Sequence, residues 1–128
     1  MKKILVIILT LVISSIIIST AFAGTLEDPV FDYVYATFNA QGIVSFTIYT
    51  TSTVPSITIS SCELQKLNSN GWETITSNFT LTNVYFDGDC FSANVNFSGS
   101  ITTGQYKVKY KPKANNHTIT CYTSSRTF

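Results

Sequence analysis

The segment GSITTGQYKVKYKPK, residues 99–113, is the part of this chain that best indicates its fold. Turn-forming residues fill its first half, and from Tyr106 onward apolar and charged side chains alternate one by one. Such period-two alternation is typical of a β-strand with one face in a core and the other in water. We therefore expect Tyr106, Val108 and Tyr110 to face inward. The side chains that then face outward are Lys107, Lys109 and Lys111.

The same alternation recurs along most of the chain, most clearly in residues 44–49 and 91–98. Segments rich in Gly, Asn, Asp or Pro separate these stretches and predict turns. The remaining expected strands cover residues 30–38, 58–67, 72–77, 79–86, 105–111 and 117–122. Roughly seven or eight short strands at about ten-residue spacing predict an all-β fold, either an antiparallel sandwich or a small barrel.

The turn before the lysine-bearing strand resembles the corner between strands E and F of immunoglobulin-like sandwiches. In that corner a tyrosine, here Tyr106 after Gly104, folds back to hydrogen-bond the preceding turn. Val108 stands where antibody domains carry their second cysteine, and no Trp occupies the buried position of strand C. The resemblance therefore implies a fibronectin-III-like antiparallel sandwich rather than a true immunoglobulin domain.

Three segments carry a wider resemblance: GIVSFTIYTTS (residues 42–52), LQKLNSNGWETI (residues 64–75) and GQYKVKY (residues 104–110). Together they are similar to a group of small secreted proteins of Gram-positive bacteria whose function is uncharacterised. The resemblance rests on hydrophobic spacing over most of the chain after residue 23. It implies a β-sandwich and brings no activity with it.

Residues 1–23 have the pattern of a secretory signal peptide. Two lysines precede an almost wholly apolar run, residues 4–18, and Ala21 and Ala23 supply the small residues that signal peptidase reads. This ending disfavours the alternative, an uncleaved membrane anchor. We expect one domain, residues 24–128, secreted or at the bacterial cell surface, which contacts the membrane only through its signal before cleavage.

Charge and motif content exclude several function classes. The chain has 8 Lys and Arg against 7 Asp and Glu, and two of the lysines belong to the signal. A nearly neutral domain is not expected to bind nucleic acid. There is one histidine, His117, and there is no nucleophile elbow, phosphate loop or supported acidic pair. Residues 87–89, Asp-Gly-Asp, suit a tight turn better than a calcium loop. We expect neither an enzyme nor a metal or cofactor.

All three cysteines of the chain lie beyond the signal. In an exported domain two of them are expected to form a disulfide. Cys62 and Cys121 share an inward parity, but an intervening strand would separate them too widely for a bridge. Cys62 with Cys90 is the favoured pair and Cys90 with Cys121 the second choice. In the favoured pairing Cys121 is a free thiol, inert if buried.

The segment LQKLNSNGWETI predicts a β-hairpin with residues 68–71 as its loop. Trp72 then lies on the outward face, where it either caps the end of the sandwich or offers a stacking platform for a sugar or an anchor for a partner. The expected cross-strand pairs are Leu64 with Ile75, Lys66 with Glu73 and Leu67 with Trp72.

The outward residues of this hairpin and of the lysine-bearing strand are expected in one sheet. The lysines either form a solvated face that discourages edge-to-edge pairing or a basic strip for an anionic wall polymer or lipid surface. If they bind a ligand, we expect a single face. Its residues are Leu67, Trp72, Lys107, Lys109 and Lys111.

Residues 30–38 are apolar on both faces of the expected strand, which hints at self-association. Either Phe31, Tyr33 and Tyr35 face inward, or Val34, Ala36 and Phe38 do.

The leading functional hypothesis is a non-catalytic extracellular binding or adhesion module. Its partner would be an extracellular protein or a cell-wall polymer. The alternatives are a membrane-active, bacteriocin-like toxin, which the amphipathic strands suggest, and a structural subunit that assembles through residues 30–38.

Overall fold

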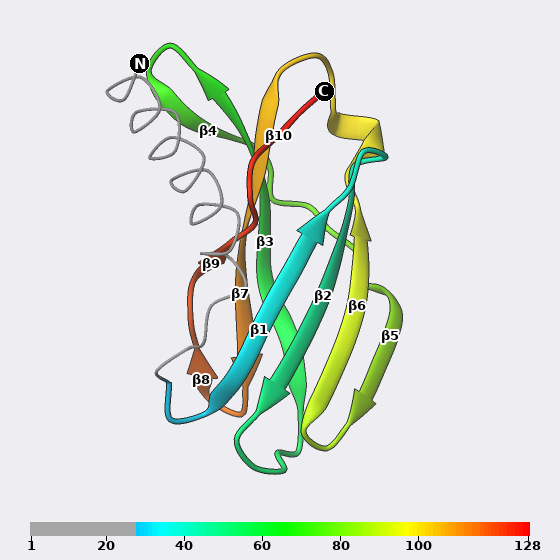
Figure 1. Cartoon of the computed structure of the whole chain (residues 1–128), viewed down its shortest axis with the longest axis vertical. Coiled ribbons are helices and arrows are strands. Elements are labelled where there is room, and N and C mark those ends of the chain that lie inside the picture. The colour runs from blue at the N-terminus through cyan, green and yellow to red at the C-terminus, as the bar shows by residue number, and fades with distance from the viewer. Residues whose placement is uncertain (1–27) are drawn as a thin grey trace, which may run out of the picture.

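The computed structural model describes residues 28–128, which are arranged as shown in Figure 1. The expected signal peptide lies outside the described residues. Apart from one short 3-10 turn (Ser98–Ser100), the regular elements here are all strands, so the all-β prediction is confirmed. The strands are β1 (Phe31–Phe38), β2 (Ile43–Thr50), β3 (Ile57–Asn68), β4 (Gly71–Thr76), β5 (Thr82–Asp87), β6 (Cys90–Asn96), β7 (Gln105–Ala114), β8 (His117–Thr118), β9 (Cys121–Tyr122) and β10 (Arg126–Thr127).

The strands form two antiparallel sheets. Sheet A has the order β1-β2-β6-β5, and sheet B has the order β10-β7-β3-β4, with β8 and β9 also paired to β7. In Figure 1 the arrows of β1, β2, β6 and β5 make one layer, and β3, β4 and β7 with the C-terminal strands make the other. No helix within residues 28–128 is long and apolar enough to cross a membrane.

The core lies between the sheets because the strands alternate as their sequences predict. Along β7 the odd-numbered lysines are partly exposed, whereas Tyr106, Val108 and Tyr110 are buried. The inward residues of sheet A meet them from the other side, and the rings of Phe46 and Tyr110 lie 4.9 Å apart between centroids. The buried residues of both sheets form one hydrophobic cluster. This shared cluster joins the two sheets.

Strand β1 combines the two orientations that its sequence allows. Phe31 is fully buried, but an irregularity between Phe31 and Tyr33 shifts the register against β2. Beyond this point Val34 and Phe38 are buried, and Tyr33 belongs to the opposite, outward face. A bulge reverses which parity faces the core, so neither single-parity alternative describes the whole strand.

The β3–β4 hairpin has two of its three expected pairs. The third is wrong, because Leu64 lies opposite Thr76 after a register shift between Leu64 and Gln65. Ile75 consequently leaves the core and is 42% exposed. The confirmed pairs are Lys66 with Glu73 and Leu67 with Trp72.

The expected strand over residues 117–122 is broken into β8 and β9. Both pair with β7, and between them the amide of Ile119 donates to the carbonyl of Pro112. Proline has no N–H to return this bond, so the ladder between the two short strands is incomplete. Further on, the hydroxyl of Thr123 accepts a bond from the amide of Val108 at 3.0 Å. A side chain thus occupies a place that a backbone carbonyl has in a regular ladder.

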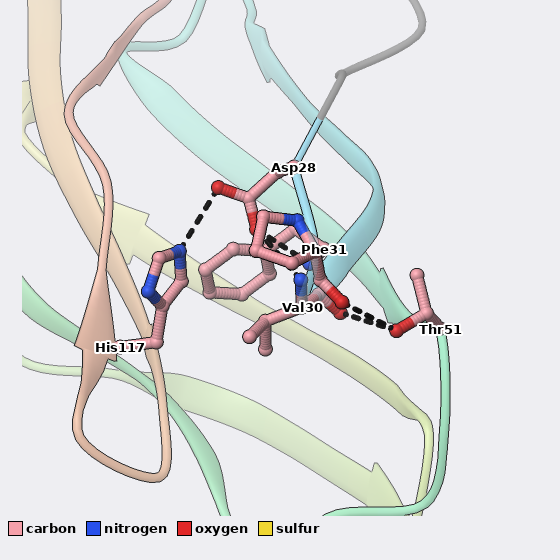
Figure 2. A network of polar contacts seen from close by, with 6 residues as sticks. Asp28, Val30, Phe31, Thr51 and His117 are labelled. Carbon is pink, nitrogen blue, oxygen red and sulfur yellow. Dashed lines mark hydrogen bonds and ion pairs between the residues drawn. The ribbon is translucent and has the colours of Figure 1, made fainter.

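The start of β1 is tied to sheet B through Asp28 (Figure 2). One carboxylate oxygen accepts bonds from the amides of Val30 and Phe31 at 2.8 and 3.0 Å. The other accepts a bond at 2.9 Å from Nε2 of His117, at the start of β8. The imidazole also packs against Phe31, with ring centroids 5.7 Å apart. Burial alone would raise the pKa of Asp28, but these hydrogen bonds hold it below its ordinary value.

Candidate functional site

The outer surface of sheet B brings the predicted binding residues together. Strand β7 is central in this sheet, so its outward lysines point away from the core between β3 on one side and β9 on the other. We call this surface the lysine-aromatic face. Its residues are Leu67, Trp72, Lys107, Lys109, Lys111 and Tyr122.

Lys107 is the centre of this face. Its Nζ lies 4.4 Å from the centroid of the Trp72 ring and 4.6 Å from that of the Tyr122 ring. Both distances are within the range of a cation-π contact. The rings come from β4 and β9, on either side of the β3–β7 pair. The long stem of lysine lets one ammonium reach both of them.

The aromatic and apolar members of the face remain open to solvent. Leu67, Trp72 and Tyr122 are 40%, 36% and 42% exposed. Monomeric proteins expose single apolar residues routinely, but a cluster with a cation at its centre is typical of an interaction surface. The sequence-based prediction that Trp72 and Lys107 share one face is confirmed by their contact.

The other two lysines are less tightly held. Lys109 Nζ lies 3.9 Å from a carboxylate oxygen of Glu63, its cross-strand neighbour on β3. Such a partly exposed pair is weak. Lys111 lies opposite Ser61 and has no ion pair among the described residues. Lys111 can therefore bind an anion directly, and Lys109 can do so at the small cost of its weak pair with Glu63.

Tyr122 was not among the residues singled out from the sequence. The signal was present, because Cys121 was assigned to the inward parity and its neighbour must then point outward. Tyr122 was missed because nothing in the sequence placed it beside Lys107 rather than elsewhere along the strand. The antiparallel register, with Tyr122 opposite Lys109, brings its ring within reach.

Gly104 lies in the corner before β7, and Tyr106 lies at the start of β7 with its ring buried in the core, on the opposite side of the sheet from the lysine-aromatic face. The Tyr106 hydroxyl accepts a bond from the amide of Thr102 at 3.1 Å and lies 3.0 Å from its hydroxyl. Gly104 has φ of 146°, and a Cβ there would lie 2.7 Å from Cε of Lys66. Both residues shape the turn, with Tyr106 only 1% exposed.

All three cysteines are free thiols, so the expected Cys62–Cys90 disulfide is not formed, and neither is the second choice, Cys90 with Cys121. Cys62 is buried in the core, whereas Cys90 has the outward parity of Ser92 on sheet A. The two thiols therefore lie on opposite sides of sheet A. Burial raises the pKa of Cys62 to about 12 and that of Cys121 to about 11. Neither has the lowered pKa of a nucleophile.

Two other kinds of site, a metal site and a pocket, have little support in the described residues. Within residues 28–128 no group of His, Cys, Asp and Glu side chains is arranged to hold a metal ion. A hollow beside the β4–β5 connection is lined by polar and aromatic residues without an ionisable group. They are Ser77, Asn78, Phe79, Thr80, Thr82 and Asn96. The lysine-aromatic face is therefore the best-defined candidate site.

Comparisons with known proteins do not identify this chain. No family model matches it, and neither a curated protein nor a solved structure is significantly similar to it.

Proposed function

We propose that this protein is an exported, non-catalytic extracellular binding or adhesion module, and that the lysine-aromatic face is its binding surface. Residues 1–23 have the features of a signal peptide, with Ala23 as the cleavage position. The protein would act at the bacterial cell surface or in the medium.

An immunoglobulin-like or fibronectin-III-like sandwich is part of this proposal. The order β1-β2-β6-β5 in one sheet corresponds to strands A, B, E and D of that fold, and β3 with β7 corresponds to C and F. The hydrogen bonds of Tyr106 with Thr102 correspond to the tyrosine corner. Domains of this architecture commonly bind through a sheet face or a loop end.

One observation carries the proposal: the ammonium of Lys107 lies between two exposed rings. Rings on both sides hold the cation in place, so an incoming anion meets a partly ordered charge. The aromatic surfaces beside it can stack on a sugar ring or an apolar side chain. This combination suits a ligand that carries acidic groups on a carbohydrate or polypeptide backbone, such as an anionic wall polymer or an acidic extracellular protein.

The single tryptophan gives a direct test of binding at this face, because the intrinsic tryptophan fluorescence of this protein comes from Trp72 alone. Titration of the exported protein with poly(glycerol phosphate), an anionic polymer, should change the emission, and salt should weaken the binding. A neutral glucan and vesicles of anionic lipid serve as comparison ligands. Leakage of dye from the vesicles would instead support the toxin alternative.

The Trp72→Ala variant tests the site itself. We expect it to weaken binding in a pull-down by about 1–3 kcal/mol while the melting temperature stays unchanged. Phe86→Ala is the matched control, because Phe86 is an aromatic of similar exposure, 40%, on sheet A. A Trp72→Ala protein that melts much earlier yet binds normally would show that Trp72 only caps the sandwich.

A further inference from the structure

Charge is divided between the two sheets. Every Lys and Arg of residues 28–128 lies on a strand of sheet B: Lys66, Lys107, Lys109, Lys111, Lys113 and Arg126. The strands of sheet A carry none of them. Their charged residues are Asp32 on β1 and Asp87 on β5, and Asp89 lies in the turn between β5 and β6. Sheet B also carries two carboxylates, Glu63 on β3 and Glu73 on β4, so the net charge of its strands is positive, whereas that of sheet A is negative.

The outer surface of sheet A is also aromatic. The ring of Tyr33 lies 6.1 Å from those of both Tyr35 and Tyr49. Across the sheet, the Tyr85 hydroxyl donates to a carboxylate oxygen of Asp87 at 3.3 Å. We call this surface the tyrosine-aspartate face. Its residues are Tyr33, Tyr35, Tyr49, Tyr85, Asp87 and Asp89.

The strand register places these residues in two neighbouring rows. One row runs from Tyr33 through Tyr49 and Cys90 to Asp87, and the next runs from Tyr35 to Tyr85. Thr47 and Ser92 fill the second row between its two tyrosines. Tyr49 and Tyr85 are 42% and 54% exposed, so their rings are accessible to a partner. Asp87 also raises the pKa of Tyr85, as a negative local potential does.

The two outer faces complement each other. One offers ammonium groups beside aromatic rings, and the other offers carboxylates beside aromatic rings, so ion pairs and cation-π contacts would both form between them. From the charges on these two faces, we infer that the lysine-aromatic face binds the tyrosine-aspartate face of a second copy of this chain. This inference rests on the proposed function, because it names the partner of the same binding surface.

A second copy explains more of the surface than the other ligands do. An anionic polymer or lipid matches the lysines but leaves the exposed tyrosines and aspartates of sheet A without a role. The domain is close to neutral once the two signal lysines are removed, so copies do not repel each other through net charge. The opposite charges of the two faces would instead orient one copy against the next.

Contact between two different faces has a consequence for the assembly. A pair of copies keeps one face of each kind free, one on each copy, so the contact does not close into a twofold dimer and can extend into a chain. Four strands spaced about 4.8 Å apart set the width of one such face, and about seven residues with a rise of about 3.3 Å each set its length. The area of one face is therefore on the order of 400 Å². Stable complexes bury roughly 800 Å² per partner. We therefore expect weak, concentration-dependent and salt-sensitive association.

Two blocked variants test this inference by sedimentation of the exported protein. Lys107→Glu with Lys111→Glu blocks the lysine-aromatic face, and Asp87→Asn with Asp89→Asn removes the carboxylates of the other without giving it a charge that the new glutamates could pair with. The wild type should increase in mean mass with concentration, and each variant alone should stay monomeric. An equimolar mixture restores a single competent contact, because one variant supplies each intact face. It should form a one-to-one dimer and nothing larger.

The controls separate this inference from the proposed function. Lys113→Glu at the far end of β7 is compared with Lys107→Glu alone, which makes the same charge change, and it should weaken association much less than the roughly tenfold or greater loss expected for Lys107→Glu. Equal loss would indicate bulk charge and overturn the inference. A wild type that stays monomeric yet binds poly(glycerol phosphate) through Trp72 would also overturn it, and the proposed function would stand. Loss of both kinds of binding would refute both.

Discussion

Sheets A and B are built from similar alternating strands, but the residue clusters on their outer faces are assembled in different ways. On sheet A, Tyr33 and Tyr35 are two positions apart on one strand, and Tyr49 lies on the next strand of the same hairpin. On sheet B, Lys107 contacts Trp72 and Tyr122, which come from strands distant in the sequence. Local pattern therefore explains the tyrosine cluster, whereas the lysine-aromatic face depends on long-range pairing.

The two faces nevertheless share one core, and breaking that core should affect both. Phe46 of sheet A is 1% exposed and packs against Tyr110 of sheet B. Phe46→Ala should lower the free energy of unfolding by about 3–5 kcal/mol through lost burial and a cavity. Urea denaturation measures this change, with Trp72 fluorescence reporting on sheet B.

The matched control is Tyr49→Ala on the same strand, whose side chain is 42% exposed on the outer face. It should cost less than about 1 kcal/mol. If the two variants were equally destabilised, the outer tyrosines would belong to the stabilising core and the separation of core from face would be wrong.

The three cysteines test the difference between the core and the outer faces, because they lie on different sides of the sheets. Cys90 lies on the partly exposed outer face of sheet A, whereas burial raises the pKa values of Cys62 and Cys121 to about 12 and about 11. A thiol reagent at pH 8 should modify Cys90 first and the other two at least about a hundredfold more slowly. Mass spectrometry of the modified peptides identifies each site.

The same experiment tests the cysteine pairing. Three thiols should react after unfolding without reductant, and Cys90→Ser should remove the fast phase from the native protein. A single reactive thiol in the unfolded protein would instead show that a disulfide forms after export.

The smallest effect concerns the contact between the two sheets at Asp28. Its folded pKa is lower than its ordinary value, so it contributes stability above pH about 4 and loses it as the pH falls through the folded value. Asp28→Ala should therefore be less stable than the wild type by about 1–2 kcal/mol at neutral pH. The difference should shrink on acidification below pH 4.

Urea denaturation at several pH values measures this profile. Asp32→Ala is the control, because Asp32 is an exposed aspartate on β1, the strand that follows Asp28. A difference between Asp28→Ala and the wild type that did not change between pH 7 and pH 2 would show that charge at Asp28 does not stabilise the fold.

Much of the fold could be predicted from alternation alone. The main strands, the inward orientation of Tyr106 and Val108 and the pairing of Leu67 with Trp72 all agree with the structure. The errors occur at irregularities. The register shift after Leu64 exposes Ile75. A bulge adds one residue without changing the apparent pattern of side chains, so a period-two rule does not detect it.

The candidate site was predictable only in part. Trp72 and Lys107 were expected on one face because their strands were assigned to one sheet, but the sequence contained no measure of how far apart they lie. The choice of Cys90 as a disulfide partner was wrong. Cys90 is two residues from Ser92, which was expected to face outward, so Cys90 also faces outward and cannot reach the buried Cys62.

The sequence by itself determined which side chains point inward along most strands and how lysines and tyrosines alternate with apolar residues. This follows because successive residues of a strand point to opposite faces whatever the strand is paired with. Only the tertiary structure decided that Lys107 lies between Trp72 and Tyr122, and that every Lys and Arg of residues 28–128 lies in one sheet. Strand order and register are set by the packing of the whole core, and no local segment contains that information.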